Sequence, residues 1–266
     1  MLKRFALLIL LAFIYIPEAH ARVDMVPHIV IFEPRERSSE ITILNLSDET
    51  REFRLKIINY KQTPPRGSYQ ILEGPLDPAF DPDQVVRFSP RTFTLAPKGL
   101  QKVRLSLRKP GDLPDGEYRF HLLATSYATE EESRPSNDNV SIVMAMNVGI
   151  AIPVIVRHGN VSSTGQLSDF DLRPGSQTQS KKPELHFLAS RSGNSSTVGR
   201  ISVAWAQDGR NFEEIGFIRN FNVFTELQER EGRVVLDKFP TSGVMKVTYF
   251  EDTQNKTLYD EIVFDL

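Results

Sequence analysis

The sequence of 266 residues contains no cysteine, so no disulfide contributes to its stability. Its five histidines are also scattered, and none lies three to five residues from another, which is the local spacing that a metal site of histidines needs. Stability must therefore come from buried apolar area, and a chain of this length suffices for one large core or two ordinary ones. The sequence predicts no metal and no cofactor.

Excess charge and catalytic motifs are lacking as well. The chain has 32 lysines and arginines against 34 aspartates and glutamates, which gives no electrostatic argument for binding nucleic acid or an anionic membrane. It contains no G-x-S-x-G, H-E-x-x-H, Walker or G-x-G-x-x-G pattern. His121 and His186 fall within predicted strands and are interpreted as packed or surface residues. The acidic stretch "TEEES" is interpreted as a solvated loop. No motif indicates an enzyme.

The first 21 residues, "MLKRFALLILLAFIYIPEAHA", have the layout of a secretory signal peptide. Lys3 and Arg4 precede a twelve-residue apolar stretch, and Ala19 and Ala21 form a small-x-small cleavage site. A bilayer needs roughly 20 apolar residues, so this stretch is too short to span one. An uncleaved anchor is the alternative. We expect cleavage after Ala21 and an exported protein without stable membrane insertion.

Short apolar stretches separated by Gly, Pro, Asn and Asp follow, a pattern typical of an all-β sandwich or barrel. In "EFRLKII", Phe53, Leu55 and Ile57 point one way and Arg54 and Lys56 the other, as in a half-buried strand. We predict strands at 28–33, 39–46, 52–60, 92–96, 100–108, 117–127, 140–156, 183–190, 198–206, 212–218, 232–239, 244–250 and 258–266.

These strands predict an immunoglobulin-like domain over 22–157 and a second β-sandwich over 158–266, with a hinge at 158–160 and a cleft between them. In "LPDGEY", Tyr118 follows a turn glycine at the start of a strand, as in a tyrosine corner whose hydroxyl is bonded to the backbone upstream. The proline-rich segment 62–84 is predicted to be a long irregular connection.

The run "SIVMAMNVGIAIPVIV", residues 141–156, is longer than a strand of one small domain needs. A last strand lies at a sheet edge, and this one lacks the lysines and brevity that usually protect edges from pairing with another chain. It is either a long strand with one face in the core, or an edge that donates a strand to a partner. On the second interpretation, the residues that enter the partner are Ile142, Met144, Met146, Val148 and Ile150. A bulge would instead give that role to Val143 and Ala145.

Three segments, "FSPRTFTLAPKGLQKVRLSL", "LPDGEYRFHLLATS" and "GIAIPVIVRHG", resemble the periplasmic pilus chaperones of the PapD-like family. "SRSGNSSTVGRISVAW" and "NFNVFTELQEREGRVVLDKF" are similar to that family's second domain, and the likeness is closer to archaic-type members. The resemblance implies two immunoglobulin-like domains in a boomerang. It also implies that the long strand caps a pilus subunit until an outer-membrane usher takes it, without ATP or metal.

The sequence departs from this family at the cations that hold the subunit's terminal carboxylate. His28, Ile29 and Val30 stand where the resemblance implies an arginine, and residues 151–153, "AIP", where it implies a lysine. Arginine suits carboxylate capture, and each substitute must be weighed against an ordinary solvated arginine. The candidates are Arg157 at the hinge and, on strands expected beside the long one, Arg87, Arg91 and Arg104.

The sequence therefore predicts a periplasmic chaperone that binds and caps fimbrial subunits by strand donation before their delivery to an usher. The alternative is an exported structural or adhesive surface protein built on the same two-domain scaffold. A secreted enzyme has no positive support.

Overall fold

The computed structural model describes residues 23–128, 147–251 and 257–266, and most of them lie in strands. The first sandwich contains β1 (Val23–Val26), β2 (Val30–Phe32), β3 (Ser38–Asn45), β4 (Arg51–Thr63), β5 (Ser68–Leu72), β6 (Val86–Ser89), β7 (Thr92–Leu95), β8 (Leu100–Leu107), β9 (Gly116–Ala128) and β10 (Val148–His158). The second contains β11 (Ser163–Arg173), β12 (Glu184–Gly193), β13 (Thr197–Ala206), β14 (Glu213–Val223), β15 (Glu229–Val235), β16 (Val244–Phe250) and β17 (Leu258–Asp265). Two short helical turns are α2 (Pro82–Val85) and η1 (Gly175–Gln177). Neither is long and apolar enough to cross a bilayer, and the described residues hold no other helix.

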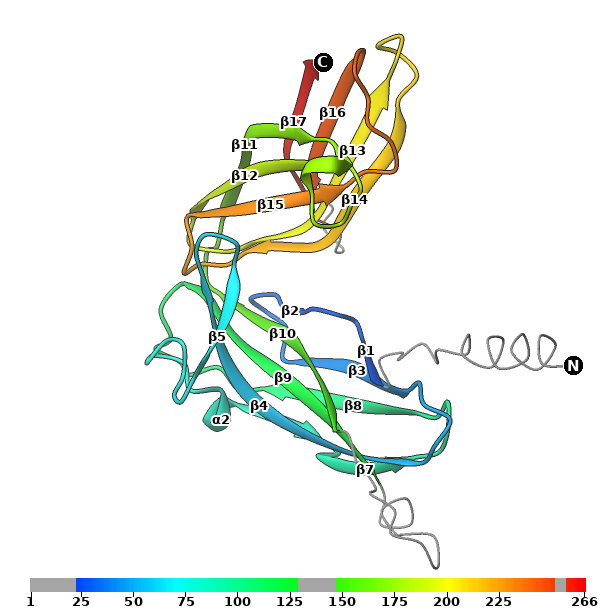
Figure 1. Ribbon diagram of the computed structural model, residues 1–266. Coiled ribbons are helices and arrows are strands. Elements are labelled where there is room, and N and C mark those ends of the chain that lie inside the picture. Colours follow the sequence, from blue (N-terminus) through cyan, green and yellow to red (C-terminus); the bar gives the residue numbers. More distant parts are fainter. Residues whose placement is uncertain (1–22, 129–146, 252–256) are drawn as a thin grey trace, which may run out of the picture.

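Each sandwich is built from two packed sheets, and the two sandwiches are inclined to one another (Figure 1). In the first, the sheet β1-β3-β8-β6 packs on the sheet β2-β10-β9-β4-β5, where β7 also pairs with β4. In the second, the sheet β11-β12-β15 packs on β14-β13-β16-β17. The predicted all-β class with two sandwich domains is confirmed.

The two sandwiches have separate cores, each filled by the alternate residues of its strands. In the first, Ile41 and Val103 of one sheet and Phe120 and Leu122 of the other are almost fully buried. In the second, the residues around Tyr249 form a cluster of their own. Burial stabilises a domain by about 1.5–3 kcal/mol for each large apolar side chain, so each sandwich has its own source of stability.

The predicted tyrosine corner is confirmed at the start of β9. The hydroxyl of Tyr118 donates a hydrogen bond to the carbonyl oxygen of Pro114 at 2.9 Å. The ring itself is buried and stacks on Phe80, with ring centroids 5.2 Å apart. The corner therefore fixes the loop that leads into the strand next to β10.

The prediction of an irregular connection over 62–84 is wrong in part. β4 continues to Thr63, and after a turn the chain returns as β5, so that β4 and β5 form a hairpin. The helical turn α2 follows, with Asp81 as its N-cap. Pro64 and Pro65 fall in the turn, and the later prolines fall in the loop and in α2. β5 has only five residues and is mostly exposed, so its alternation is too short to stand out among these prolines.

Candidate functional site

The edge of β10 is the feature on which the candidate site depends. On one side β10 pairs with β9 along its whole length, from Val148 to His158. On the other side it pairs only with β2, in parallel, from Val154 to Val156. Within the described ranges, the backbone from Val148 to Pro153 has no strand partner on that side.

This edge is open because the first strand of the domain changes sheets. β1 pairs with β3 of the opposite sheet, from Val23 against Asn45 to Val26 against Thr42. Only after Val26 does the chain cross to β2 and cover the end of β10. The crossing therefore leaves the first half of the described strand uncovered.

One face of β10 belongs to the core of its own domain. Ile152, Val154 and Val156 are buried there, and Val148 and Ile150 pack against the same core while remaining half-exposed. Two of the predicted donor residues thus lie at the rim of the core, on the face the sequence assigned to them. The other three, Ile142, Met144 and Met146, lie outside the described residues, as do Val143 and Ala145.

The opposite face of β10 looks toward the second domain at its far end. Ile155 is fully buried in a small cluster with Val198 and Phe224 of the second sandwich. Farther from the junction, Gly149, Ala151 and Pro153 share this face and are small. The strand therefore passes from a buried junction at one end to an open edge at the other.

Arg157, the predicted carboxylate anchor at the hinge, is held by two carboxylates of its own domain. Its side chain is 8% exposed, with Nη1 2.9 Å from Glu33 Oε1 and Nε 3.4 Å from Glu117 Oε2. The hydroxyl of Ser196, in the second domain, donates a hydrogen bond to Glu117. Burial raises the pKa of the Glu117 carboxyl, against the opposing effects of Ser196 and Arg157. A partner's carboxylate at Arg157 would compete with these groups.

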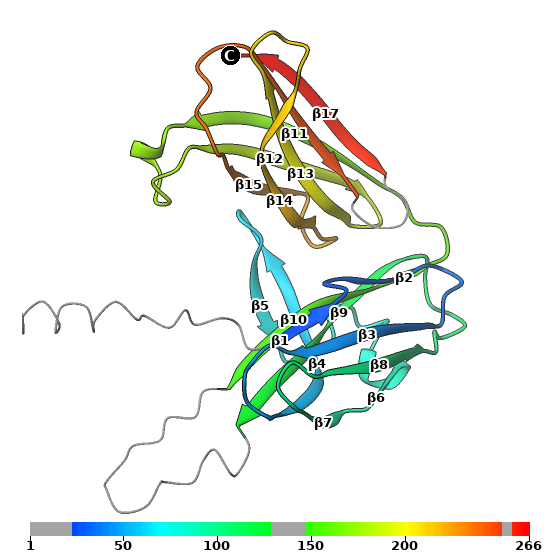
Figure 2. The same ribbon diagram turned by 90° about the vertical axis from the view of Figure 1, so that its right-hand side faces the viewer.

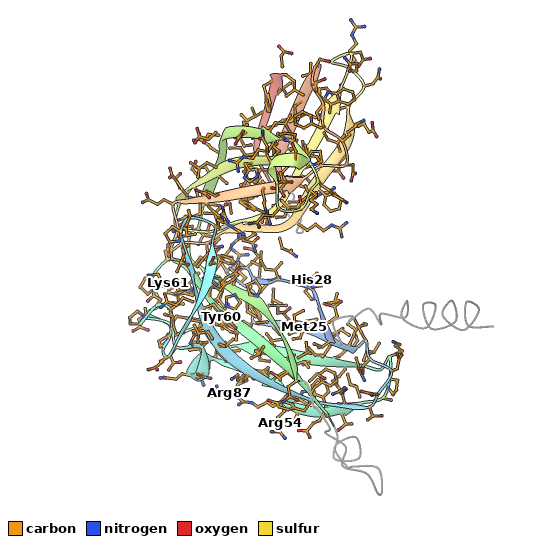
Figure 3. The ribbon with its side chains drawn as sticks, in the orientation of Figure 1. Met25, His28, Arg54, Tyr60, Lys61 and Arg87 are labelled. Atoms are coloured by element: carbon orange, nitrogen blue, oxygen red, sulfur yellow. The ribbon has the colours of Figure 1, made fainter. Side chains whose placement is uncertain are left out.

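The other three arginines do not lie on strands next to β10, and that expectation is wrong. Arg87 is on β6 and Arg104 on β8, both in the opposite sheet, and Arg91 follows β6. All three are exposed. The Arg87 guanidinium donates to the carbonyl oxygens of Asp83 and Val86 at 3.0 Å, and Figure 3 shows this residue on the side of the first sandwich away from the second. Strand order in the sequence does not reveal which sheet a strand joins, so the error could not be seen there.

A buried cation that the sequence did not suggest lies at the domain junction. Arg119 of β9 forms an ion pair with Glu226 of the second domain, and their side chains are 2% and 10% exposed. Its guanidinium lies 3.8 Å above the centre of the Phe224 ring. In the sequence, Glu117, Arg119 and His121 alternate with apolar residues and resemble a solvent face. The only sign of a buried charge in the sequence was that three alternate residues on one face of the strand are ionisable.

His121, beside Arg119, is buried and neutral. Burial lowers its pKa to about 3, and the charge of Arg119 adds to the effect. Its ring packs edge-on against Tyr60 and Tyr69, with centroid distances of 4.9 and 5.6 Å. Such a packed histidine agrees with the sequence interpretation.

A hollow of about 390 Å³ adjoins the ion pair of Arg119 and Glu226. Lys61 and Asp77 also line it, so the hollow is lined by charges of both signs.

Among the residues that the structure describes, no group of three or more His, Cys, Asp or Glu side chains could hold a metal ion. The groups of the site that are open to another chain are the unpaired edge of β10 and the half-exposed Val148 and Ile150.

No protein-family model and no curated protein sequence matches the chain. Several solved structures that are similar to it along nine-tenths of its length are of chaperones. The YadV chaperone has a TM-score of 0.44 and 10% identity over 92% of this chain and 100% of its own. The E. coli chaperone DraB has a TM-score of 0.42 and 15% identity over 92% and 95%. The complex of the chaperone CsuC with the tip adhesion subunit CsuE, from archaic chaperone–usher Csu pili of Acinetobacter baumannii, has a TM-score of 0.42 and 12% identity over 91% and 97%.

Proposed function

We propose that the protein is a periplasmic chaperone that binds and caps pilus subunits by β-strand donation before their delivery to an outer-membrane usher. The observation that carries the proposal is the open edge of β10 from Val148 to Pro153. The N–H and C=O groups on this edge can pair with a strand of another chain, which is the physical basis of strand addition.

The side chains at this edge support a donor role. Val148 and Ile150 are half-exposed at the rim of the core, on the same face as the buried Ile152. The sequence continues this face with Ile142, Met144 and Met146. A subunit that lacks one strand of its own has an apolar groove, and alternate apolar residues of a donor strand would fill it. Methionine suits such a role because its flexible side chain adapts to irregular pockets.

The expected signal peptide supports a periplasmic location for this activity. A subunit exported in the same way would meet the protein there, and capping would keep its open groove from aggregating. Transfer to the usher follows from the resemblance of the sequence to the pilus chaperones.

Co-expression with an incomplete immunoglobulin-like subunit encoded beside the gene tests the proposal. We expect a one-to-one complex in which the backbone amides of residues 148–152 exchange hydrogen more slowly than in the free protein. The amides of β17, an edge strand of the second domain, serve as the control and should not change. A complex that leaves the amides of residues 148–152 unprotected would exclude strand donation. Self-association without any subunit would favour the alternative of a structural surface protein.

A further inference from the structure

The β4–β5 hairpin extends beyond its own sandwich and reaches the second one (Figure 1 and Figure 2). β4 pairs with β9 only as far as Ile58. Beyond that point its sole strand partner in the described part of the chain is β5, from Asn59 against Leu72 to Thr63 against Ser68. The end of the hairpin therefore extends past the pairing with β9, although Tyr60 and Tyr69 still pack on His121 of that strand.

The side-chain amide of Gln62 bonds to the backbone of the second sandwich, as the peptide group of a neighbouring strand would. Gln62 is fully buried, and its amide Nε2 donates to the carbonyl oxygen of Asn222 at 3.1 Å, while its Oε1 accepts from the backbone N–H of Phe224 at 3.1 Å. Its own backbone N–H donates to Glu226 Oε1 at 2.6 Å. A buried primary amide with both of its polar atoms bonded to the backbone of another domain is a geometrically demanding contact.

The turn of the hairpin makes a second set of contacts with the start of β15. The carbonyl oxygen of Pro65 accepts from the backbone N–H of Glu231 at 2.8 Å, and that of Arg66 accepts from Arg230 Nε at 3.0 Å. Gly67 has a φ of +70°, and a Cβ built there would lie 2.6 Å from Arg230 Nε. The turn thus fits closely against the second domain.

The hairpin joins the sandwiches at a different place from the chain crossing between β10 and β11. Beside that crossing, Ile155 of the first sandwich already packs with Val198 and Phe224 of the second. A single connection allows rotation about a hinge, whereas two connections at different places resist it. We infer that the β4–β5 hairpin is a strut that holds the two sandwiches at one angle, with Gln62 as its positioning residue. The inference is independent of strand donation.

The absence of cysteine makes the angle measurable, because two cysteines can be introduced for spin labels. Ser106, exposed on β8, and Val263, 53% exposed on β17, place one label on each sandwich. We expect one narrow distance distribution in the parent protein. In Gln62→Ala combined with Arg230→Ala it should become broad, while the thermal unfolding of the two separate cores changes little.

Gln70→Ala is the matched control, because Gln70 is an exposed glutamine of the same hairpin on the opposite face of β5 from Tyr69. It should keep the narrow distribution. If the double variant does not fold, Gln62→Glu replaces it, since glutamate has nearly the same shape but cannot donate to the Asn222 carbonyl at neutral pH. A folded variant of either kind that keeps the narrow parental distribution would overturn the inference.

Discussion

Arg119 of the first sandwich and Glu226 of the second form an ion pair that crosses the domain junction, and the Arg119 side chain is only 2% exposed. Glu226 also accepts the backbone N–H of Gln62, so one carboxylate holds both the cation and the hairpin. Desolvated charges cost free energy unless they are paired. Docking of the two domains therefore depends on both Arg119 and Glu226.

Removing one partner of this pair should destabilise the protein strongly. Arg119→Met leaves the Glu226 carboxylate nearly buried without its cation, and the expected loss in free energy of unfolding is about 3–5 kcal/mol. The double variant Arg119→Met/Glu226→Leu should recover much of this loss, because a buried ion pair can be replaced by apolar residues at little cost. Urea unfolding of the two single variants and the double variant measures the coupling.

An exposed ion pair provides the control for this experiment. Lys98 and Asp48 lie 2.9 Å apart, but the Lys98 side chain is 63% exposed. Lys98→Ala should therefore cost no more than about 1 kcal/mol. Equal losses for Lys98→Ala and Arg119→Met would show that the junction pair is no more important than a surface contact.

Acid should weaken the junction through His121. The folded state holds its pKa at about 3, below the ordinary value of 6.5, so the unfolded chain binds a proton that the folded protein does not. The contribution to stability is complete above about pH 6.5 and is lost as the pH falls toward 3, by at most about 1.4 kcal/mol per unit. His121→Gln should reduce this slope. Unfolding free energies of both proteins at several values between pH 4 and 7 test the prediction, and parallel curves would contradict it.

The sequence predicts strands best where apolar residues alternate. Each of the thirteen predicted segments overlaps a strand of the structure, whereas β1, β5, β6 and β11 were not predicted. β5 is mostly exposed, and β11 has only Gly165 and Leu167 buried and a bulge between Ser168 and Asp171. Strands of this kind are formed by tertiary contacts, and the local pattern does not record them.

Of the candidate site, only the apolar face of β10 could be predicted from the sequence. The apolar face of β10 follows from the alternation that ends at Val156. The pairing of its other edge depends on β1 changing sheets, and the partners of Arg157 and Arg119 come from segments far away in the chain. Such long-range contacts are set by topology, so the sequence predicted the apolar face of β10 but not the ion pairs at the junction.

We expect Arg157 to stabilise the free protein rather than to bind the carboxylate of a subunit. Arg157→Ala would leave Glu117, whose side chain is 1% exposed, without its cation. The free protein should lose about 3–5 kcal/mol of unfolding free energy, and Glu117→Gln in the same chain should restore part of it. Urea unfolding measures this loss. Unchanged stability of the free variant together with weaker subunit binding would instead identify Arg157 as the carboxylate anchor.

The last prediction concerns the donor strand itself, and it rests on the proposed function. Replacing Met144 and Met146 together by Asp would place two charges in the apolar groove of a subunit, a desolvation cost that should abolish capture. Ile152, on the same face, is 2% exposed within the core of the first domain. Ile152→Asp should therefore unfold the free protein, whereas the methionine variant should keep most of its melting temperature. Thermal melts beside a pull-down of the subunit distinguish the two.

The register of the strand decides which residues the subunit contacts. Because side chains alternate with a period of two, a shift by one residue would exchange the two faces. Val143→Asp combined with Ala145→Asp is thus the matched variant, with the same charge placed on the other face. We expect it to weaken capture less than the methionine variant does. Stronger loss of capture in the Val143 and Ala145 variant would show a bulge before Val148. Donor residues at an open edge would contribute little to the core of their own domain. A methionine variant that unfolds without any subunit would therefore contradict the donor role.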